Sequence, residues 1–329
     1  MQRYRSFTGF FIQKYGTRLQ KVVVDAGFTC PNRDGTVGSG GCTYCDNKAF
    51  HPGYSTPDKS LTQQIDEGIE FHHIRYRKAG GYLAYFQPYS NTHAPLEDLR
   101  RIYKPVLEDP RISGIVIGTR PDCIDNQKLA YFRELSEEKI VMLEYGVESC
   151  YNRTLRRINR CHTWEQSVEA IQATAAHGLH TGIHMILGLP GESREDMLKE
   201  AAILSRLPVT SLKLHQLQIV KGTPMEKEFE KVPGDFVTFT LPEYLDFVID
   251  FLELLRPDIF IERIAGEVPP RFVNATPWGL IRNVEIIRLL EKRLEERNTF
   301  QGAKYVTPEE NPVPGNPLLP ANFCGNDQA

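Results

Sequence analysis

The sequence lacks the features that mark a secreted or membrane-spanning chain. No apolar run approaches the roughly 18 residues of a membrane span, and the N-terminus MQRYRSFTGFFIQKYG has charges where a signal peptide has an apolar core. A strong charge of one sign is also missing, because 39 basic side chains are balanced by 42 acidic ones. This balance gives no global signature of polyanion binding. We expect a globular cytoplasmic protein without a membrane partner.

Cysteine is scarce and unevenly placed. The chain has seven cysteines in 329 residues, an odd number, and three of them lie in the stretch CPNRDGTVGSGGCTYC at residues 30–45. A reducing cytoplasm disfavours a disulfide framework. The C-x2-C pair in this stretch therefore favours a metal site or reactive thiols.

The two ends of the chain differ from its middle. Residues 1–24 contain five basic residues and no acidic one, interleaved with aromatic side chains. Two interpretations are open: an arm that contacts RNA phosphates and bases, or a terminal segment docked on the fold. Residues 307–329 contain five prolines and no apolar periodicity, which predicts an extended or disordered tail.

Between these ends, short β-branched runs alternate with amphipathic helical stretches. The predicted strands are residues 21–25, 82–87, 114–119, 139–147, 182–188, 211–220 and 258–264. Thr163 with Gln166 three residues on predicts a helix N-cap, and Gly178 predicts the end of that helix. Repeated strand–helix alternation predicts a parallel sheet with helices on its outside.

Polar, turn-rich segments follow five successive strands, always on the carboxyl side. An open sheet concentrates its site at one switch point, whereas a barrel draws site residues from most of its strand ends. We therefore predict a partial (β/α)6 TIM-like barrel with a C-terminal α/β extension. The predicted divisions are an arm at 1–20, a core at 21–235, an extension packed on the barrel at 236–306 and the tail at 307–329.

The cysteine loop has the spacing C-x11-C-x2-C, formed by Cys30, Cys42 and Cys45. Two metal sites fit three thiols. His51 could complete a closed Cys3His zinc site. Alternatively, an iron–sulfur cluster with three cysteine ligands leaves one iron open, and an open coordination position lets a metal centre bind and activate a small molecule. From the loop alone both remain open.

The loop, with Tyr44 before the last cysteine, resembles the cluster loop of the radical S-adenosylmethionine (radical SAM) superfamily. The long spacing is similar to that of the branch containing the catalytic subunit of Elongator. The other stretches that carry the resemblance are GFTCPNRDG, YFQPYSNT, TRPD, GVES, NRCHT, GLPGE, VKGTP, RIAGEVP and PWGL, spread over residues 4–306. Together they resemble a family of bacterial Elongator-like radical SAM proteins.

The resemblance implies that Cys30, Cys42 and Cys45 hold three irons of a [4Fe–4S] cluster. The amino and carboxylate groups of S-adenosylmethionine would then chelate the fourth iron. One electron through the cluster, from a donor such as flavodoxin or ferredoxin, would cleave the sulfonium and give a 5′-deoxyadenosyl radical. That radical would abstract a hydrogen atom from the substrate.

The resemblance also assigns S-adenosylmethionine contacts. Tyr44 would lie near the adenine. Tyr89, Ser90 and Asn91 stand where many relatives have Gly-Gly-Glu, whose carbonyls hold the methionine amino group. The alternative for Tyr44 is a packing residue.

Further assigned contacts lie later in the chain. Glu148 would bind ribose hydroxyls and Arg160 the carboxylate, for which a guanidinium fork is well shaped. Gly188 and Gly191 would let the backbone approach the adenine, or else only form a strand-to-helix turn. Cys161 stands where relatives have glycine, so we expect no positive φ there. His215 could face the barrel lumen.

Three functions are compatible with these features. The first is a radical SAM enzyme that acts on the wobble uridine of transfer RNA and converts a carboxymethylaminomethyl side chain to aminomethyl. For it, the basic arm and a cationic helix at 281–298 would meet the polyanion. The second is a radical SAM enzyme that acts on a small metabolite or a protein. The third, which the motif set disfavours, is a non-enzymatic zinc module.

Overall fold

A computed structural model describes residues 2–75, 79–274 and 278–307, so residues 308–329 of the predicted tail and Pro277 lie outside the described residues. The strands of the described residues form one parallel sheet of seven strands in chain order. They are β1 (Leu19–Val24), β2 (Gly81–Phe86), β3 (Ile112–Thr119), β4 (Ile140–Glu148), β5 (His180–Leu187), β6 (Ser211–Gln216) and β7 (Phe260–Arg263). The predicted α/β half-barrel of the TIM type is confirmed.

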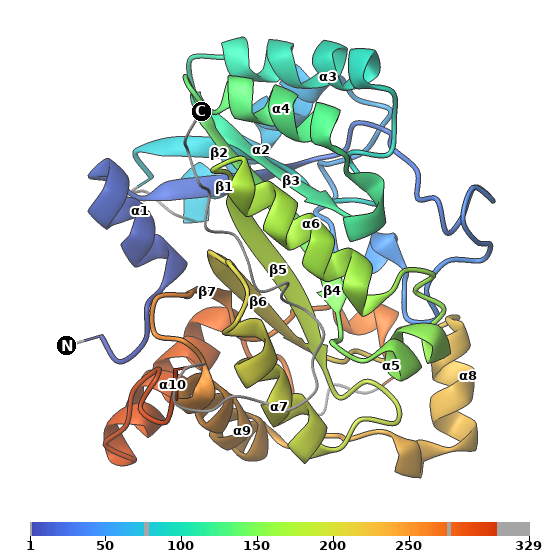
Figure 1. Cartoon of the computed structure of the whole chain (residues 1–329), viewed down its shortest axis with the longest axis vertical. Coiled ribbons are helices and arrows are strands. Elements are labelled where there is room, and N and C mark those ends of the chain that lie inside the picture. Colours follow the sequence, from blue (N-terminus) through green and yellow to red (C-terminus); the bar gives the residue numbers. More distant parts are fainter. Residues whose placement is uncertain (1, 76–78, 275–277, 308–329) are drawn as a thin grey trace, which may run out of the picture.

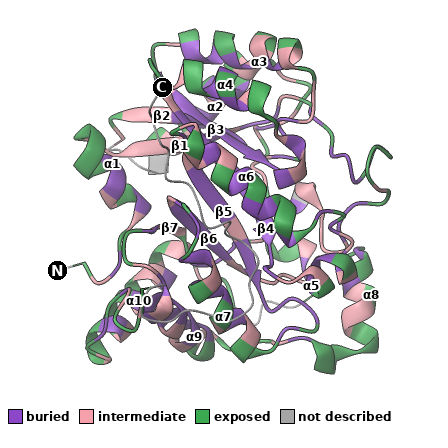
Figure 2. Ribbon diagram, viewed as in Figure 1, coloured by how far each residue is buried: buried purple, intermediate pink, exposed green. Residues whose placement is uncertain are grey.

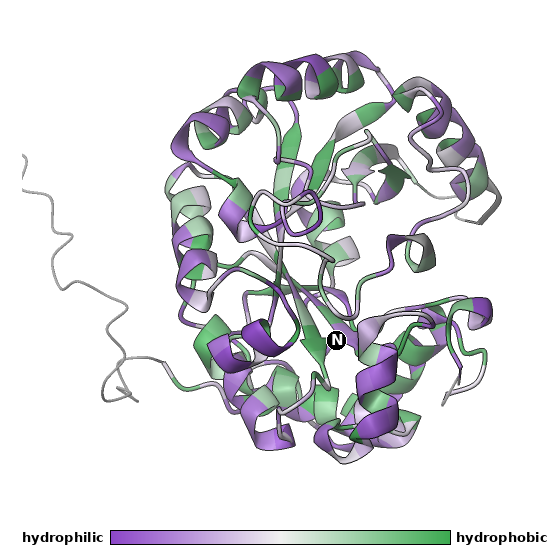
Figure 3. Cartoon of the chain, turned by 90° about the vertical axis from the view of Figure 1, so that its right-hand side faces the viewer, coloured by the Kyte–Doolittle hydropathy of each residue, from purple (hydrophilic) through white to green (hydrophobic). Residues whose placement is uncertain are grey.

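Helices connect the strands and cover the outside of the sheet, as Figures 1 and 3 show. The helices of the described residues are α1 (Phe7–Tyr15), α2 (Leu61–Arg75), α3 (Leu96–Glu108), α4 (Asn126–Leu135), α5 (Asn152–Arg157), α6 (Trp164–Ala176), α7 (Arg194–Leu204), α8 (Pro224–Lys231), α9 (Leu241–Leu254) and α10 (Asn283–Glu296). Helix α1 is the exception, because it precedes β1 and packs on the inner face of the sheet. Figure 2 shows the strands largely buried and the outer faces of the helices exposed. No helix of the described residues is long and apolar enough to cross a membrane.

Local signals place several elements as expected. Thr163 and Gln166 form a capping box at the start of α6, and Gly178 takes a φ of 69° just after the helix ends. Two predictions about the strands were inaccurate. The strand predicted at 211–220 ends at Gln216, and the strand predicted within the C-terminal extension pairs with β6 as the seventh strand of the same sheet.

The core has two parts, because side chains along each strand point alternately to the outer and the inner face of the sheet. On β1, Val22 and Val24 are buried, and Val24 belongs to the large core of outward side chains and helices. The inward side chains Leu83, Val116 and Met142 instead form a second cluster with the aromatic rings of α1. Because side chains of a strand point alternately to its two faces, each strand contributes to both layers.

The N-terminal segment fills the inside of the half-barrel at the amino ends of the strands. Phe7, Phe10 and Phe11 of α1 are buried against the inner face of the sheet, and the ring of Phe10 lies 4.4 Å from that of Phe260 at the start of β7. Arg5 stacks over the same Phe260 ring at 4.6 Å. The expectation that these rings contact RNA bases is therefore wrong, because they form part of the core, and the alternative of a docked segment is confirmed.

The cationic helix expected at the C-terminal end is also largely neutralised. Arg293 of α10 pairs with Asp246 of α9 at 2.7 Å, and Arg297 pairs with Asp250 at 2.5 Å. Arg288 is paired with Glu285 one turn before it at 2.6 Å. These cations form ion pairs with α9 or within α10, so they do not present an uncompensated positive face to a polyanion.

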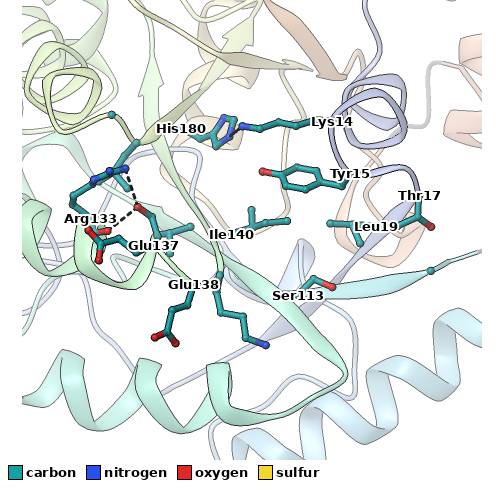
Figure 4. Close-up of a pocket in the computed structure, with 16 residues that line it drawn as sticks. Lys14, Tyr15, Thr17, Leu19, Ser113, Arg133, Glu137, Glu138, Ile140 and His180 are labelled. Atoms are coloured by element: carbon teal, nitrogen blue, oxygen red, sulfur yellow. Dashed lines mark hydrogen bonds between the residues drawn. The ribbon is translucent and has the colours of Figure 1, made fainter.

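A cavity of about 520 Å³ lies at the amino edge of the barrel, beside α1 (Figure 4). Lys14, Tyr15 and His180 line it from one side and Arg133 from another, and no cysteine lies on its wall. Lys14 Nζ lies 3.2 Å from His180 Nε2, which joins α1 to the start of β5. None of the residues of the cysteine loop lies on the wall of this cavity.

We predict that Phe11→Ala destabilises the protein by about 3–5 kcal/mol, because a ring that is 1% exposed leaves a cavity when truncated. Chemical denaturation measures the free energy of unfolding. The neighbouring residue Ile12, which is 52% exposed on the same helix, provides the control, and Ile12→Ala should change stability by less than about 0.5 kcal/mol. Equal effects of the two substitutions would contradict the assignment of α1 to the core.

Candidate active site

The cysteine loop runs from Cys30 to Cys45 across the carboxyl edge of the sheet, between β1 and α2. It turns at once, because the amides of Arg33 and Asp34 both donate to the Cys30 carbonyl, at 2.7 and 3.1 Å. It turns again at Gly40 and Gly41, which both have a φ of 79° that other residues rarely adopt. These turns return the chain to the same edge with the second and third thiols.

A segment far along the chain holds the loop in place. The buried Asn32 donates through Nδ2 to the Asn159 carbonyl at 2.5 Å, and Asn159 donates through its own Nδ2 to the Gly41 carbonyl at 2.8 Å. The Thr43 amide donates to the Ile158 carbonyl at 3.0 Å. No role for either asparagine was predicted from the sequence, although Asn32 lies in the stretch GFTCPNRDG and Asn159 in NRCHT. They fasten the cysteine loop to the loop between α5 and α6.

One cavity of about 230 Å³ is lined by all three cysteines of the loop. Of the residues that the resemblance assigned to the cosubstrate, four line the same cavity, and these are Tyr44, Tyr89, Glu148 and Arg160. His215 also lies on its wall, as expected for a residue facing the lumen. Residues from β1 to β7 and their following loops thus meet at one site.

Arg160 and Glu148 form a buried pair beside the thiols. Arg160 donates through Nη1 to Cys42 Sγ at 3.5 Å and through Nη2 to the Gly146 carbonyl at 2.5 Å, and Nη2 lies 3.6 Å from Glu148 Oε1. The register with β5 shifts between Gly146 and Glu148, and Glu148 takes a φ of 71°. This irregularity re-aims the glutamate at the end of β4, as bulges near active sites do.

A second arginine supports the first from behind. Arg120 is almost fully buried, and its Nη1 donates to the Arg160 carbonyl at 2.9 Å. The same guanidinium holds Asp122 at 2.8 and 2.7 Å. Although burial acts to raise the pKa of Asp122, the bonds from Arg120 keep that pKa below its usual value. The sequence motif TRPD therefore encodes a positioning pair that sequence analysis had not assigned.

His162 completes this region as an uncharged group. Burial, followed by the positive charges of Arg160 and Arg120, lowers the pKa of His162 to about 3. Its Nε2 lies 3.3 Å from the Gly146 carbonyl, which also accepts from Arg160. A neutral imidazole here adds no further positive charge beside two buried guanidinium groups.

The other assigned residues lie outside the cavity wall. Ser90 is fully buried, and its hydroxyl contacts Cys123 and accepts from the Arg120 amide. Asn91 is buried as well; its Nδ2 donates to the carbonyls of Phe86, Pro88 and Gly118, and its own carbonyl accepts the Tyr103 hydroxyl. Of the three residues expected to hold the methionine amino group, only Tyr89 reaches the cavity, with a φ of 62°.

The two glycines after β5 make close contacts with the chain itself. A Cβ at Gly188 would lie 2.7 Å from the Val237 carbonyl oxygen, and Gly191 donates its amide to the Asp235 carbonyl at 2.8 Å. Both have positive φ, 95° and 82°. The turn that packs against residues 235–237 explains why glycine occupies both positions. A strand-to-helix turn was the alternative to a backbone contact with the adenine.

The expectation for Cys161 is wrong. Its φ is 60°, in the left-handed region, one residue from a buried arginine and two from Asn159, whose φ is 52°. The thiol faces the cysteine loop, because a Cβ on Gly38 would lie 2.8 Å from it. The tight turn between α5 and α6 requires a left-handed backbone conformation at position 161. For a residue other than glycine, this conformation costs about 1–2 kcal/mol.

The donor set discriminates between the two metal centres. Among the described residues, no group of three His, Cys, Asp or Glu side chains is close enough together to bind one metal ion. His51 does not line the cavity; its Nδ1 lies 3.4 Å from the Pro52 carbonyl. A closed Cys3His zinc site needs four ligands on one ion, whereas each cysteine of an iron–sulfur cluster binds its own iron. Three thiols on one cavity wall fit the cluster.

A parallel half-barrel with three thiols and a buried arginine–glutamate pair at its carboxyl edge defines a cofactor-dependent barrel enzyme. The chain belongs to the radical SAM superfamily. The model of this superfamily matches residues 32–202, and that of the radical SAM C-terminal domain matches residues 209–296. Its cofactors are accordingly a [4Fe–4S] cluster and S-adenosylmethionine. Bound together, they supply one-electron cleavage of S-adenosylmethionine to a hydrogen-abstracting radical.

The chain is also similar to individual proteins. The chain is 35% identical over 314 residues to the uncharacterized protein YtqA of Bacillus subtilis, covering 94% of this chain and 95% of that one. A tRNA uridine(34) acetyltransferase of Methanocaldococcus infernus is 26% identical over 163 residues, covering 48% of this chain and 29% of that protein. The archaeal Methanocaldococcus infernus Elp3 structure shares the fold, with a TM-score of 0.64 and 18% identity over 86% of this chain and 64% of that chain.

We predict that Cys30→Ala, Cys42→Ala and Cys45→Ala each prevent cluster assembly, whereas the protein itself takes up about four irons per chain on anaerobic reconstitution. Iron and sulfide analysis measures this without any assay of activity. Cys161→Ala is the matched control, since this thiol is exposed and contacts the cysteine loop without lining the cavity. Full iron content in a variant of the loop cysteines, or loss of iron in the control, would contradict the ligand set.

Proposed function

We propose that this radical SAM enzyme belongs to the Elongator-like branch and acts on the wobble uridine of transfer RNA, where it converts a carboxymethylaminomethyl side chain to aminomethyl. S-adenosylmethionine would serve as the two-electron oxidant, ending as methionine and 5′-deoxyadenosine, and addition of water would release the two-carbon group as glyoxylate. The C-x11-C-x2-C spacing of the cysteine loop supports the branch. Similarity to enzymes named for uridine 34 of transfer RNA supports the substrate. Flavodoxin or ferredoxin is the proposed electron donor.

The observation that carries the proposal is a cavity that joins the cysteines to the barrel lumen. Besides the three thiols, its wall includes Glu144, Lys213 and His215, which lie on inward positions of β4 and β6. The cavity therefore extends from the residues assigned to the cosubstrate to charged and polar side chains deeper in the lumen. A base turned out of the anticodon loop, as base-modifying enzymes require, would present its side chain to this inner part.

We assign the cosubstrate contacts to the residues on the cavity wall. Arg160 holds the carboxylate of S-adenosylmethionine, Glu148 the ribose hydroxyls, and Tyr44 the adenine. Tyr89 offers its backbone carbonyl to the methionine amino group. Four of the predicted residues lie outside the cavity wall and would stabilise the turns that carry these contacts: Ser90, Asn91, Gly188 and Gly191.

Transfer RNA needs a docking surface other than the buried N-terminal segment. Lys221 and Arg271 are exposed and lie on paired segments, since the Lys221 amide donates to the Phe272 carbonyl at 2.8 Å and Val220 bridges Val273. Neither side chain has an ion pair with the described residues. Both segments continue from residues of the cavity wall, Gln218 and Glu267. We propose this rim as the phosphate-binding surface.

The substrate is tested by mass spectrometry of transfer-RNA nucleosides from a strain that lacks the gene. We expect 5-carboxymethylaminomethyl-type wobble uridines to accumulate and the aminomethyl-derived species to disappear. Expression of the intact protein should restore the pattern, and the Cys42→Ala variant should not. An unchanged nucleoside profile would rule out this substrate in favour of a small metabolite or a protein.

The docking rim is tested by the salt dependence of transfer-RNA binding. Each phosphate contact contributes a slope of about −0.7 to −0.9 in a plot of log K against log salt. The double substitution Lys221→Gln with Arg271→Gln should therefore flatten the slope by about 1.4 to 1.8. The control is Lys292→Gln with Arg288→Gln on α10, where both cations are paired with glutamates of the same helix. A slope that responds only to the control pair would place the RNA on α10.

A further inference from the structure

A closed ring of two lysines and two glutamates crosses the lumen beneath the cysteines. Lys213 Nζ lies 2.8 Å from Glu144 Oε2 and 2.7 Å from Glu262 Oε1. Lys21 pairs with the same two glutamates, with Glu262 at 2.7 Å. The four residues come from β1, β4, β6 and β7, and Lys21 lies over the ring of Phe7 at 4.8 Å. The ring therefore sits on the aromatic floor formed by α1.

This ring is internally neutral and fully paired. Although burial acts to raise the pKa of Glu144, Lys21 and Lys213 hold that pKa well below its usual value. His184 adds a hydrogen bond from Nε2 to Glu144 Oε2 at 2.8 Å. Burying four charges is costly, and replacing such networks by apolar residues is often neutral or stabilising. Stability alone does not explain a charged layer at this position.

Directly above the ring lie two polar side chains without such partners. Arg263 pairs in register with Lys213, is exposed on the cavity wall, and has no ion pair or hydrogen bond with the described residues. His215 lines the same wall and has no hydrogen bond to them either, only a ring contact with His184 at 5.9 Å. Burial, followed by the charge of Arg263, lowers the pKa of His215 well below its usual value. The guanidinium of Arg263, which has no ion pair with the described residues, and the neutral imidazole of His215 therefore lie on the same cavity wall.

The backbone keeps room for this pair. Gln216 accepts the Gly266 amide at 2.7 Å and donates to the Gly266 carbonyl at 3.0 Å, which fixes the segment after β7 against β6. A Cβ at Gly266 would lie 3.0 Å from His215 Nδ1, so the glycine leaves the imidazole its place. Of the five basic side chains on the wall, three are paired with carboxylates, whereas Arg33 and Arg263 have no ion pair with the described residues. The electrostatic character of the wall favours an anionic group.

We propose that Arg263 and His215 form the subsite for a carboxylate on the substrate side chain. The guanidinium fork binds the carboxylate and His215 donates the hydrogen bond that completes it, while the ion ring below gives the group a polar, water-poor floor. The carboxymethylaminomethyl side chain ends in an N-substituted glycine, and the choice of this group as the ligand rests on the proposed function. The other source of a carboxylate in this cavity is S-adenosylmethionine, and the experiment separates the two.

The probe is N-methylglycine, which reproduces the terminal group of the proposed side chain, with N-methylglycinamide as the version without a carboxylate. Binding to the reconstituted protein is measured by saturation-transfer NMR. We expect N-methylglycine to bind better than the amide, and Arg263→Gln to weaken only the former, by about 10- to 100-fold. Arg101→Gln, at a side chain 78% exposed on α3, is the matched control and should leave both affinities unchanged.

Two results would overturn the subsite. One is an N-methylglycine affinity that is absent, equal to that of the amide, or unchanged in Arg263→Gln. The other is a loss of S-adenosylmethionine affinity in Arg263→Gln as large as that in Arg160→Ala, which would assign Arg263 to the cosubstrate. Binding of the probe that depends on Arg263, together with an unchanged nucleoside profile in the deletion strain, would uphold the subsite and reject transfer RNA as the substrate.

Discussion

The packing of three phenylalanines of α1 into the inner face of the sheet is the contact on which the remaining architecture depends. The helices that connect the strands lie outside the half-barrel and leave its inner surface uncovered, and apolar side chains such as Leu83 and Met142 lie on that surface. Burial of Phe7, Phe10 and Phe11 removes this surface from water at the amino ends of the strands. The cavity that contains the cysteines consequently opens at the carboxyl edge.

The inside of the half-barrel is therefore arranged in layers along the strands. The aromatic floor comes first, then the ring of Lys21, Glu144, Lys213 and Glu262, then the cavity with the thiols at its rim. Each layer is drawn from several strands, because a parallel sheet brings equivalent positions of neighbouring strands to the same height. The buried aromatic floor closes the amino end of the lumen to bulk water below the cavity.

The sequence predicted the frame of this site more accurately than its details. Strand–helix alternation and the position of the cysteine loop after the first strand both proved correct, because they depend on local periodicity and on spacing along the chain. The failures were of another kind. The aromatic, basic N-terminal segment was open to two interpretations, since composition does not reveal what a terminal helix packs against. The cations of α10 are evident in the sequence, but their pairing with Asp246 and Asp250 of α9 depends on how the two helices pack.

What the sequence determined by itself is the chemistry of the donors: three thiols on a glycine-rich loop, and charged residues at alternating positions of apolar strands. Only the tertiary structure decided which of these groups meet. Lys21 and Glu262 lie near opposite ends of the chain, yet they are 2.7 Å apart because β1 and β7 face one another across the lumen. Likewise Asn32 finds Asn159 only once the strands have aligned. The reason is physical: side-chain direction alternates along each strand, but which strands face each other is set by how the whole sheet curls.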